Sequence, residues 1–318
     1  MKLILLIFIL LAGHAQADDL LHVGGAELEV HFDDGFDASE RQVVTRWLER
    51  YSQALAGLYG RFPVEQARYQ IKRASYGKGP VPWAEVRREG VEGVNFYLGK
   101  ELSSYSLMAD WTAAHELSHL LMPYPGRSDV WLSEGLASWY QGILMFNAGL
   151  KSEQALWQGL IDGFSRADSS RFTGRLSQAS REMKSQHSYM RVYWVGAAYY
   201  LQMEYALQLH GEQLLAVLSS YQSCCRNDSS SKTGREFITA LDEQLGMSLF
   251  SYYYDKWRDS EKMPDVSSAL TWFGVSQEDG QVVLDKEHIS AMRRAQLYKY
   301  PVEVPKSRLL ALGGRRPK

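Results

Sequence analysis

The sequence is poor in several features that would restrict it to a special class of protein. Cysteine occurs only twice among the 318 residues, as the adjacent pair Cys224 and Cys225. Neighbouring cysteines cannot join distant segments of one chain, so a disulfide framework is excluded. The pair is expected either to form a vicinal disulfide or to remain as free thiols in a loop. The fold must therefore be stabilised by a hydrophobic core.

An excess of charge of one sign is also missing. The 35 Lys and Arg residues nearly balance the 37 Asp and Glu residues, for a formal net charge of -2. This balance creates no global field that would attract nucleic acid or an anionic membrane, so we expect local recognition and no nucleic-acid partner. With 45% hydrophobic and 23% charged residues, the composition is that of a folded globular protein.

The longest apolar run lies near the N-terminus, over residues 3–12, and is too short to span a bilayer comfortably. Lys2 precedes it, and the small residues Ala15 and Ala17 follow it in an A-x-A arrangement. This pattern is typical of a secretory signal peptide. We therefore expect residues 1–17 to be removed and the mature chain to be exported, periplasmic or secreted, without stable membrane insertion.

Apolar spacing predicts strands early in the mature chain and helices after them. Alternating or short apolar runs predict strands over 26–32, 66–76 and 93–98, and apolar residues three and four apart predict a helix over 39–58. Further helices are expected over 108–122, 131–147, 151–165, 188–209, 211–221, 235–246 and 248–260. Residues 270–285 carry a hairpin signal.

This order of elements predicts an α+β fold, in which a small α/β lobe is followed by a mostly helical lobe. The expected division is a signal peptide over 1–17, an N-terminal α/β lobe over 18–107, a helical lobe over 108–265, and a C-terminal hairpin with a basic tail over 266–318. The Ser-rich stretch 219–234, which includes the cysteine pair, is expected to be an exposed loop.

The segment His-Glu-Leu-Ser-His, residues 115–119, carries the main chemical signal. On a helix, His115 and His119 project from the same face, one turn apart, so that their imidazoles can share one metal ion. Glu116 follows the first histidine and can reach a water on that metal without being a ligand, as the general base of a zinc peptidase does. The alternative is a pair of surface histidines on an ordinary helix.

Glu134 is the only acid in the apolar and aromatic run 130–140. A carboxylate in such a run is costly to bury unless a cation compensates its charge. A zinc ion on His115 and His119 would do so, which makes Glu134 the candidate third ligand of a His2Glu site. Ser138, one turn later, is a candidate hydrogen-bond partner outside the ligands. Alternatively, Glu134 is stabilised at a helix N-terminus by the helix dipole.

Together, residues 115–119 and the segment Trp-Leu-Ser-Glu-Gly-Leu-Ala-Ser-Trp at 131–139 resemble gluzincin metallopeptidases. The similarity is to the aminopeptidase N-like and glycyl aminopeptidase-like branches of the peptidase MA-like domains. This resemblance implies a thermolysin-like zincin with its zinc site in the cleft between the two lobes. It also implies one Zn²⁺ per chain, bound by His115, His119 and Glu134.

The same families imply two further features of the site. A Tyr-x-x-Gly-Ala-like segment with a transition-state-stabilising tyrosine is matched at 193–197, which assigns this role to Tyr193. An edge strand before the zinc helix pairs with the substrate, and residues 93–96 occupy the corresponding place. The Gly-x-Met-Glu-Asn motif of the aminopeptidases is missing, so the sequence does not distinguish an aminopeptidase from an endopeptidase.

The sequence therefore predicts an exported zinc metallopeptidase that hydrolyses peptide bonds through a Glu-activated zinc-bound water. Zinc would supply the electrophile and lower the pKa of the water, and Glu116 would take its proton. The expected partner is a peptide or protein substrate. The alternative function is a non-catalytic, zinc-stabilised binding protein of the same fold, which chelator-sensitive cleavage of a peptide would exclude.

Overall fold

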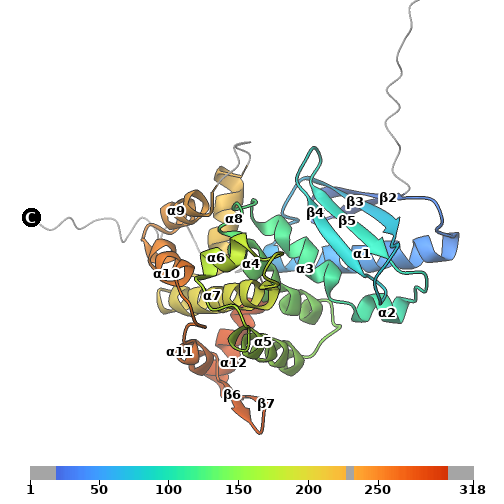
Figure 1. Ribbon diagram of the computed structural model, residues 1–318. Coiled ribbons are helices and arrows are strands. Elements are labelled where there is room, and N and C mark those ends of the chain that lie inside the picture. Colours follow the sequence, from blue (N-terminus) through green and yellow to red (C-terminus); the bar gives the residue numbers. More distant parts are fainter. Residues whose placement is uncertain (1–18, 227–232, 300–318) are drawn as a thin grey trace, which may run out of the picture.

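The computed structural model describes residues 19–226 and 233–299. The expected signal peptide and most of the expected basic tail lie outside these ranges. The described residues form a part that contains a sheet and a part made mostly of helices, which lie side by side (Figure 1). No helix within these ranges combines the length and the hydropathy needed to cross a bilayer.

The main sheet has five strands, two of which the sequence did not predict. They are β1 (Asp19–Val23), β2 (Ala26–Phe32), β3 (Gln66–Arg73), β4 (Trp83–Arg87) and β5 (Gly93–Leu98). Their order is β1-β2-β3-β5-β4; β2, β3 and β5 are parallel, and β1 and β4 are antiparallel edges. The predicted strands correspond to β2, β3 and β5, whereas β1 and β4 were missed.

This order corrects the expected position of the edge strand. Residues 93–96 belong to β5, which lies between β3 and β4, so β4 is the edge of the sheet on this side. β4 has only five residues, and Glu85 and Arg87 in it are polar. Such a short and half-polar segment carries little apolar signal, and it becomes a strand through its pairing with β5.

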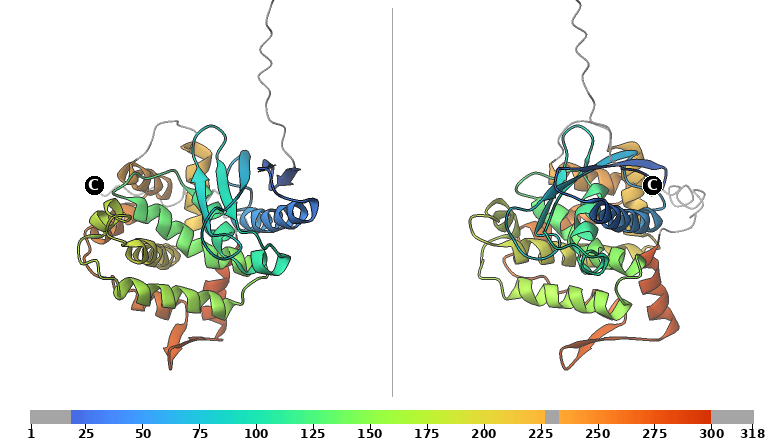
Figure 2. Two further views of the ribbon diagram at one scale, coloured as in Figure 1. Left: turned by 45° about the vertical axis from the view of Figure 1, so that its right-hand side comes forward. Right: turned by 90° about the vertical axis from the view of Figure 1, so that its right-hand side faces the viewer.

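Helix α1 (Ala38–Tyr59) connects the parallel strands β2 and β3 and covers one face of the sheet (Figures 1 and 2). Asp37 begins the helix with a capping box, in which its side chain accepts from the Glu40 backbone N–H. On the buried face, the Trp47 and Phe96 rings lie 5.1 Å apart, edge to face. Aromatic packing of this kind fixes α1 against the sheet.

Helix α2 (Ser104–Ala109) packs against α1, beside the sheet (Figure 1). The other described helices form the second part of the molecule. They are α3 (Thr112–Ser118), α4 (Val130–Asn147), α5 (Glu153–Asp168), α6 (Leu176–Arg181), α7 (Tyr189–Leu209), α8 (Leu214–Cys224), α9 (Gly234–Leu245), α10 (Leu249–Arg258), α11 (Ser267–Trp272) and α12 (His288–Ala295). Two 3-10 turns, η1 (His119–Leu121) and η2 (Gln296–Tyr298), and the hairpin of β6 (Val275–Glu278) and β7 (Gln281–Leu284) complete the structure.

Several of these elements differ from the prediction. The expected helix over 108–122 is divided into α2, α3 and η1, because the Asp110 side chain accepts from the Thr112 backbone N–H and so starts a new helix. Helices α6, α11 and α12 were not predicted. The loop expected over 219–234 begins later, since α8 continues to Cys224, which forms a disulfide with Cys225. Residues 227–232 of that loop lie outside the described residues.

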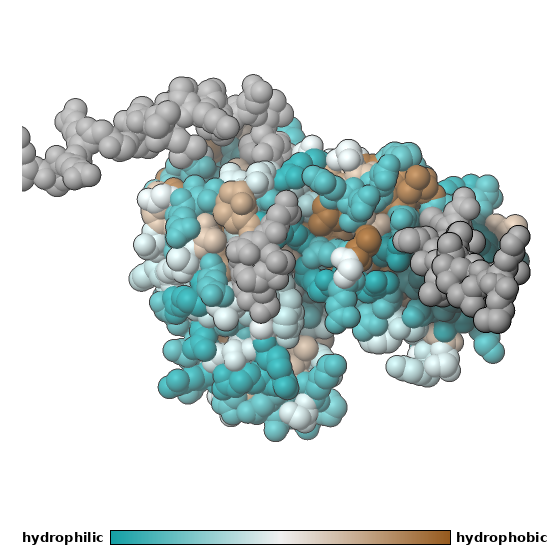
Figure 3. Space-filling view, turned by 90° about the horizontal axis from the view of Figure 1, so that it is seen from above, coloured by the Kyte–Doolittle hydropathy of each residue, from teal (hydrophilic) through white to brown (hydrophobic). Residues whose placement is uncertain are grey.

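Seen from above, the surface is mostly hydrophilic, and hydrophobic residues form small separate areas (Figure 3). The apolar side chains lie instead in a core that runs through both parts of the molecule. This core extends from Leu28 and Trp47 at the sheet to Trp257 and Phe273 among the helices. The two parts therefore share buried contacts, and α3 packs against α1, α4 and β4 where they meet.

Candidate metal centre

The three candidate ligands come from two neighbouring helices. His115 lies in α3, and His119 begins η1 directly after that helix. Glu134 lies in the first part of α4, which packs against α3. The two histidines therefore approach the site from one helix axis and the carboxylate from another.

A close crossing of α4 and α7 holds the second of these helices in place. A Cβ added to Gly196 would lie 2.2 Å from the Trp131 carbonyl oxygen, and one added to Gly135 would lie 2.3 Å from the Gly196 carbonyl carbon. Only glycine permits backbones to approach so closely. Because Gly135 follows Glu134 and Gly196 lies one turn after Tyr193, this crossing brings both side chains to the same place.

The donor atoms of the three candidate ligands fit one zinc ion. His115 Nε2 lies 3.2 Å from Glu134 Oε2, and His119 Nε2 lies 3.6 Å from the same oxygen. All the donor atoms lie within 4.8 Å of one another. Ligands around a tetrahedral zinc with bonds of about 2.0–2.1 Å lie about 3.3 Å apart, close to these distances. Within the described residues this is the only such group of His, Cys, Asp and Glu.

Hydrogen bonds at the other ring nitrogens orient both histidines. His115 Nδ1 lies 3.0 Å from Gln141 Oε1, and His119 Nδ1 lies 2.9 Å from Ser133 Oγ. Gln141 Oε1 can only accept, so His115 donates from Nδ1 and keeps its Nε2 lone pair for a metal. Ser138, the candidate partner from the sequence, bonds neither histidine, because its buried hydroxyl has no hydrogen-bond partner among the described residues.

The buried charges of the site also suit a cation. Burial lowers the pKa of His119 to about 3, so this imidazole is neutral and able to bind a metal at neutral pH. Burial alone would raise the pKa of Glu134, but His119 and His115 hold it below its usual range. For His115, burial acts to lower the pKa, and Glu134 outweighs it and raises the pKa. The set thus offers one carboxylate and two imidazoles.

Glu116 lies beside this group without belonging to it. None of the described residues makes a hydrogen bond or ion pair with the Glu116 carboxylate. Burial raises the pKa of this group to about 7. The charge of His115 opposes this increase, and the charges of Glu134 and Glu85 add to it. A carboxylate that is partly buried, unpaired and has a pKa near neutrality is suited to accept a proton.

Tyr193 reaches the site from α7. Its ring stacks on the His115 ring, with the centroids 5.6 Å apart. Burial, followed by the charges of Glu134 and Glu116, raises the pKa of the phenol above its usual range. Tyr193 therefore keeps its proton and can act as a donor. The structure thus brings together all five side chains that the sequence singled out.

Several residues around the site are not predicted from the sequence. Trp111, at the start of α3, places its ring edge to face against His115, 5.3 Å away. Gln141 lies two helical turns after Glu134, a spacing that could have indicated it. Ser133 directly precedes Glu134. Arg88 comes from the loop after β4, and no sequence signal connects that loop to α3.

Comparisons with known proteins identify the fold. No protein-family model and no curated protein matches the sequence. An aminopeptidase N family protein from Idiomarina loihiensis superposes with a TM-score of 0.59 and 13% identity, covering 81% of this chain and 49% of that one. A mutant of a two-domain M1 zinc metallopeptidase bound to L-arginine superposes with a TM-score of 0.51 and 16% identity. The superposition covers 78% of this chain and 52% of that one.

These solved structures confirm the expected α+β, gluzincin-like fold. At identities of 13% and 16%, the likeness concerns the fold alone. The chain spans about half the length of each structure that it matches, 49% and 52%.

Proposed function

We propose that this protein is an exported zinc-dependent peptidase. The observation that carries the proposal is the convergence of His115, His119 and Glu134, beside which Glu116 lies without a partner. The names of the structural neighbours, an aminopeptidase N family protein and a zinc metallopeptidase, support zinc as the metal and an amide as the substrate.

The chemistry would be divided among these side chains. When bound by His115, His119 and Glu134, zinc supplies a Lewis acid and lowers the pKa of water. The Glu116 carboxylate accepts a proton from the attacking water and passes it to the leaving amine. The Tyr193 hydroxyl donates a hydrogen bond to the oxyanion that develops on the substrate carbonyl.

The free edge of the sheet supports an extended peptide as the substrate. Within the described residues β4 pairs only with β5, so its other edge has unpaired backbone groups. Extended peptides bind such edges through main-chain hydrogen bonds. Since α3 packs against β4, a peptide paired with this strand would lie next to the zinc helix. Residues 18–107 and 108–265 would then border the substrate from two sides.

The test compares zinc content and peptide hydrolysis in three variants. We expect about one zinc per chain in the wild type and none in His119→Ala. Glu116→Gln should retain zinc and lose about a hundredfold to ten-thousandfold in hydrolysis rate, because the general base is gone. Glu243→Gln, an exposed acid on α9, is the control for the change from acid to amide.

A mixture of proteome-derived peptides, with and without a chelator, serves as the substrate, and mass spectrometry of the products locates the cuts. Equal hydrolysis by Glu116→Gln and the wild type would contradict the assigned mechanism. Stoichiometric zinc without any chelator-sensitive cleavage would favour the zinc-stabilised binding protein instead. Export through residues 1–17 is tested separately, by the mass of the chain recovered outside the cytoplasm.

A further inference from the structure

The second candidate ligand, His119, lies where the zinc helix ends. Helix α3 has only seven residues, and His119 is its C-cap and the first residue of η1. Short helices fray at their ends, and their last carbonyl groups lack partners within the helix. From the described main chain, the His119 carbonyl accepts a single long bond, 3.4 Å, from the Met122 N–H. The helix therefore holds the His119 N–H, which donates to the Glu116 and Leu117 carbonyls, but leaves the His119 carbonyl weakly bonded.

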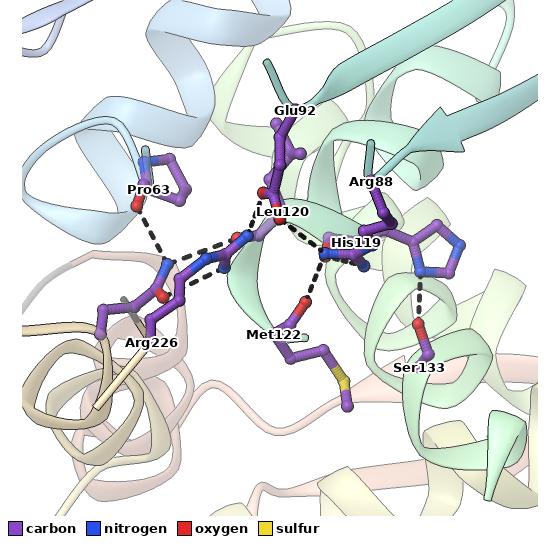
Figure 4. Close-up of polar contacts among 9 residues, drawn as sticks. Pro63, Arg88, Glu92, His119, Leu120, Met122, Ser133 and Arg226 are labelled. Atoms are coloured by element: carbon purple, nitrogen blue, oxygen red, sulfur yellow. Dashed lines mark hydrogen bonds and ion pairs between the residues drawn. The ribbon is translucent and has the colours of Figure 1, made fainter. Parts of the chain in front are cut away.

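Arg88 provides the missing donors. Its Nη2 donates to the His119 carbonyl at 2.9 Å, and its Nη1 donates to the Met122 carbonyl at 2.8 Å (Figure 4). One guanidinium thus bridges the two ends of this turn, the carbonyl of His119 and the carbonyl of Met122, which directly follows η1. Burial lowers the pKa of Arg88 to about 10, so the group stays charged at neutral pH. A cation at a helix C-terminus also interacts favourably with the helix dipole.

A second guanidinium supports the same turn. Arg226 donates to the Leu120 carbonyl and forms an ion pair with Glu92 (Figure 4). The other oxygen of Glu92 lies 3.7 Å from Arg88 Nη1, so this carboxylate lies between the two cations. Gln222 in α8 accepts from Arg226 at 3.0 Å. Two segments that are distant in sequence, residues 88–92 and 222–226, therefore hold the end of this helix.

From these contacts we propose that Arg88 is a positioning residue for the metal centre, which holds His119 in the ligand position. The inference rests on the proposed zinc function. Arg88 fixes the main chain of His119, and Ser133 fixes its ring at Nδ1. With both fixed, Nε2 remains directed toward Glu134. Without Arg88, the carbonyl groups of η1 would turn toward water, and the imidazole would move with them.

The test measures zinc affinity by competition with a chromogenic chelator. Arg88→Met removes both hydrogen bonds and should weaken zinc binding about 10-fold to 100-fold, as expected for a partner outside the ligands. Arg87→Met is the matched control, because the one hydrogen bond of the Arg87 side chain within the described residues goes to the Glu89 carbonyl and none goes to the turn at His119. Its zinc affinity should stay within about twofold of the wild type.

A second measurement separates positioning from a general effect on folding. If Arg88 positions His119, the rise in Tm that zinc produces should be smaller in Arg88→Met than in Arg87→Met. If Arg88 only stabilises the fold, Tm should fall equally with zinc and with chelator, and the proposal is overturned. Should Arg88→Met fail to fold, Arg88→Lys replaces it, since lysine keeps the charge but cannot reach both carbonyl groups in a fixed fork.

The outcomes also distinguish this inference from the proposed function. A wild-type protein that binds no zinc would end both. A wild type that binds zinc and cleaves peptides, together with Arg88→Met or Arg88→Lys of unchanged zinc affinity, would overturn the positioning role alone. Weaker zinc binding in both the Met and the Lys variants, with Arg87→Met unchanged, is the expected result.

Discussion

Glu204 is expected to make the stability of this protein depend on pH. It lies in α7 with 2% of its surface exposed. Its one hydrogen bond among the described residues is long, 3.4 Å from the Leu214 backbone N–H, and no cation pairs with it. Burial, opposed by this hydrogen bond, raises the pKa of Glu204 from 4.5 to about 8. The folded protein therefore holds this carboxyl protonated at neutral pH.

The direction and size of the effect follow from the two pKa values. Between pH 4.5 and about 8 the folded chain retains a proton that the unfolded chain has lost, so the free energy of unfolding falls as pH rises. The slope approaches about 1.4 kcal/mol per pH unit. Over the whole window this amounts to about 5 kcal/mol, present below the lower pKa and lost above the higher one.

The assay is urea unfolding of the wild type, Glu204→Gln and the control Glu243→Gln, from about pH 5 to about pH 8 with chelator present. Glutamine can accept the same hydrogen bond from Leu214 but does not titrate. We expect the variant to become progressively more stable than the wild type, by about 4 kcal/mol at the upper end. A difference between the two proteins that does not change with pH would refute the reasoning.

Two further variants test the geometry of the site. Gly196→Ala places a methyl group 2.2 Å from a carbonyl oxygen of α4, so it should cost about 1–3 kcal/mol of unfolding free energy and weaken zinc binding. In Gly57→Ala, the control in α1, the methyl meets nothing within 4 Å, and unfolding should show no loss. Ser133→Ala removes the partner of His119 Nδ1 and should weaken zinc binding about tenfold in a chelator competition. Ser138→Ala should leave zinc binding unchanged, because the Ser138 hydroxyl has no hydrogen-bond partner in the described part of the chain. Equal affinities of the two serine variants would contradict the assignment.

The sequence indicated the metal centre because that signal is local. The spacing of four residues from His115 to His119 places both on one helix face, whatever packs around them. Glu134 stood out because it is the only acid in an apolar run. Helical spacing likewise predicted α7 within one residue of its observed start at Tyr189. These features depend only on residues that are close in sequence, so they can be recognised from the sequence of one protein.

The features that the sequence did not predict depend on neighbours in space. β4 is a strand because β5 pairs with it, and its own residues are half polar. Arg88 belongs to the loop after β4, and strand β5 lies between this loop and α3 in the sequence. Only the folded structure therefore brings Arg88 to His119. Ser138 is a candidate partner of a ligand by its place one turn after Glu134, and the sequence does not assign the partners of the two histidines, which in the structure are Gln141 and Ser133.

The glycines near Glu134 and Tyr193 show how packing and chemistry are combined in short motifs. Gly135 and Gly196 meet at the crossing of α4 and α7, where neither position has room for a side chain. Each glycine follows a candidate functional residue by no more than one helical turn, so the closest approach of the two helices coincides with the site. The Glu-Gly pattern at 134–135 and the Tyr-x-x-Gly pattern at 193–196 therefore belong to the same contact, one on α4 and the other on α7. A change at either glycine should therefore disturb zinc binding and stability together, although neither residue is a candidate ligand.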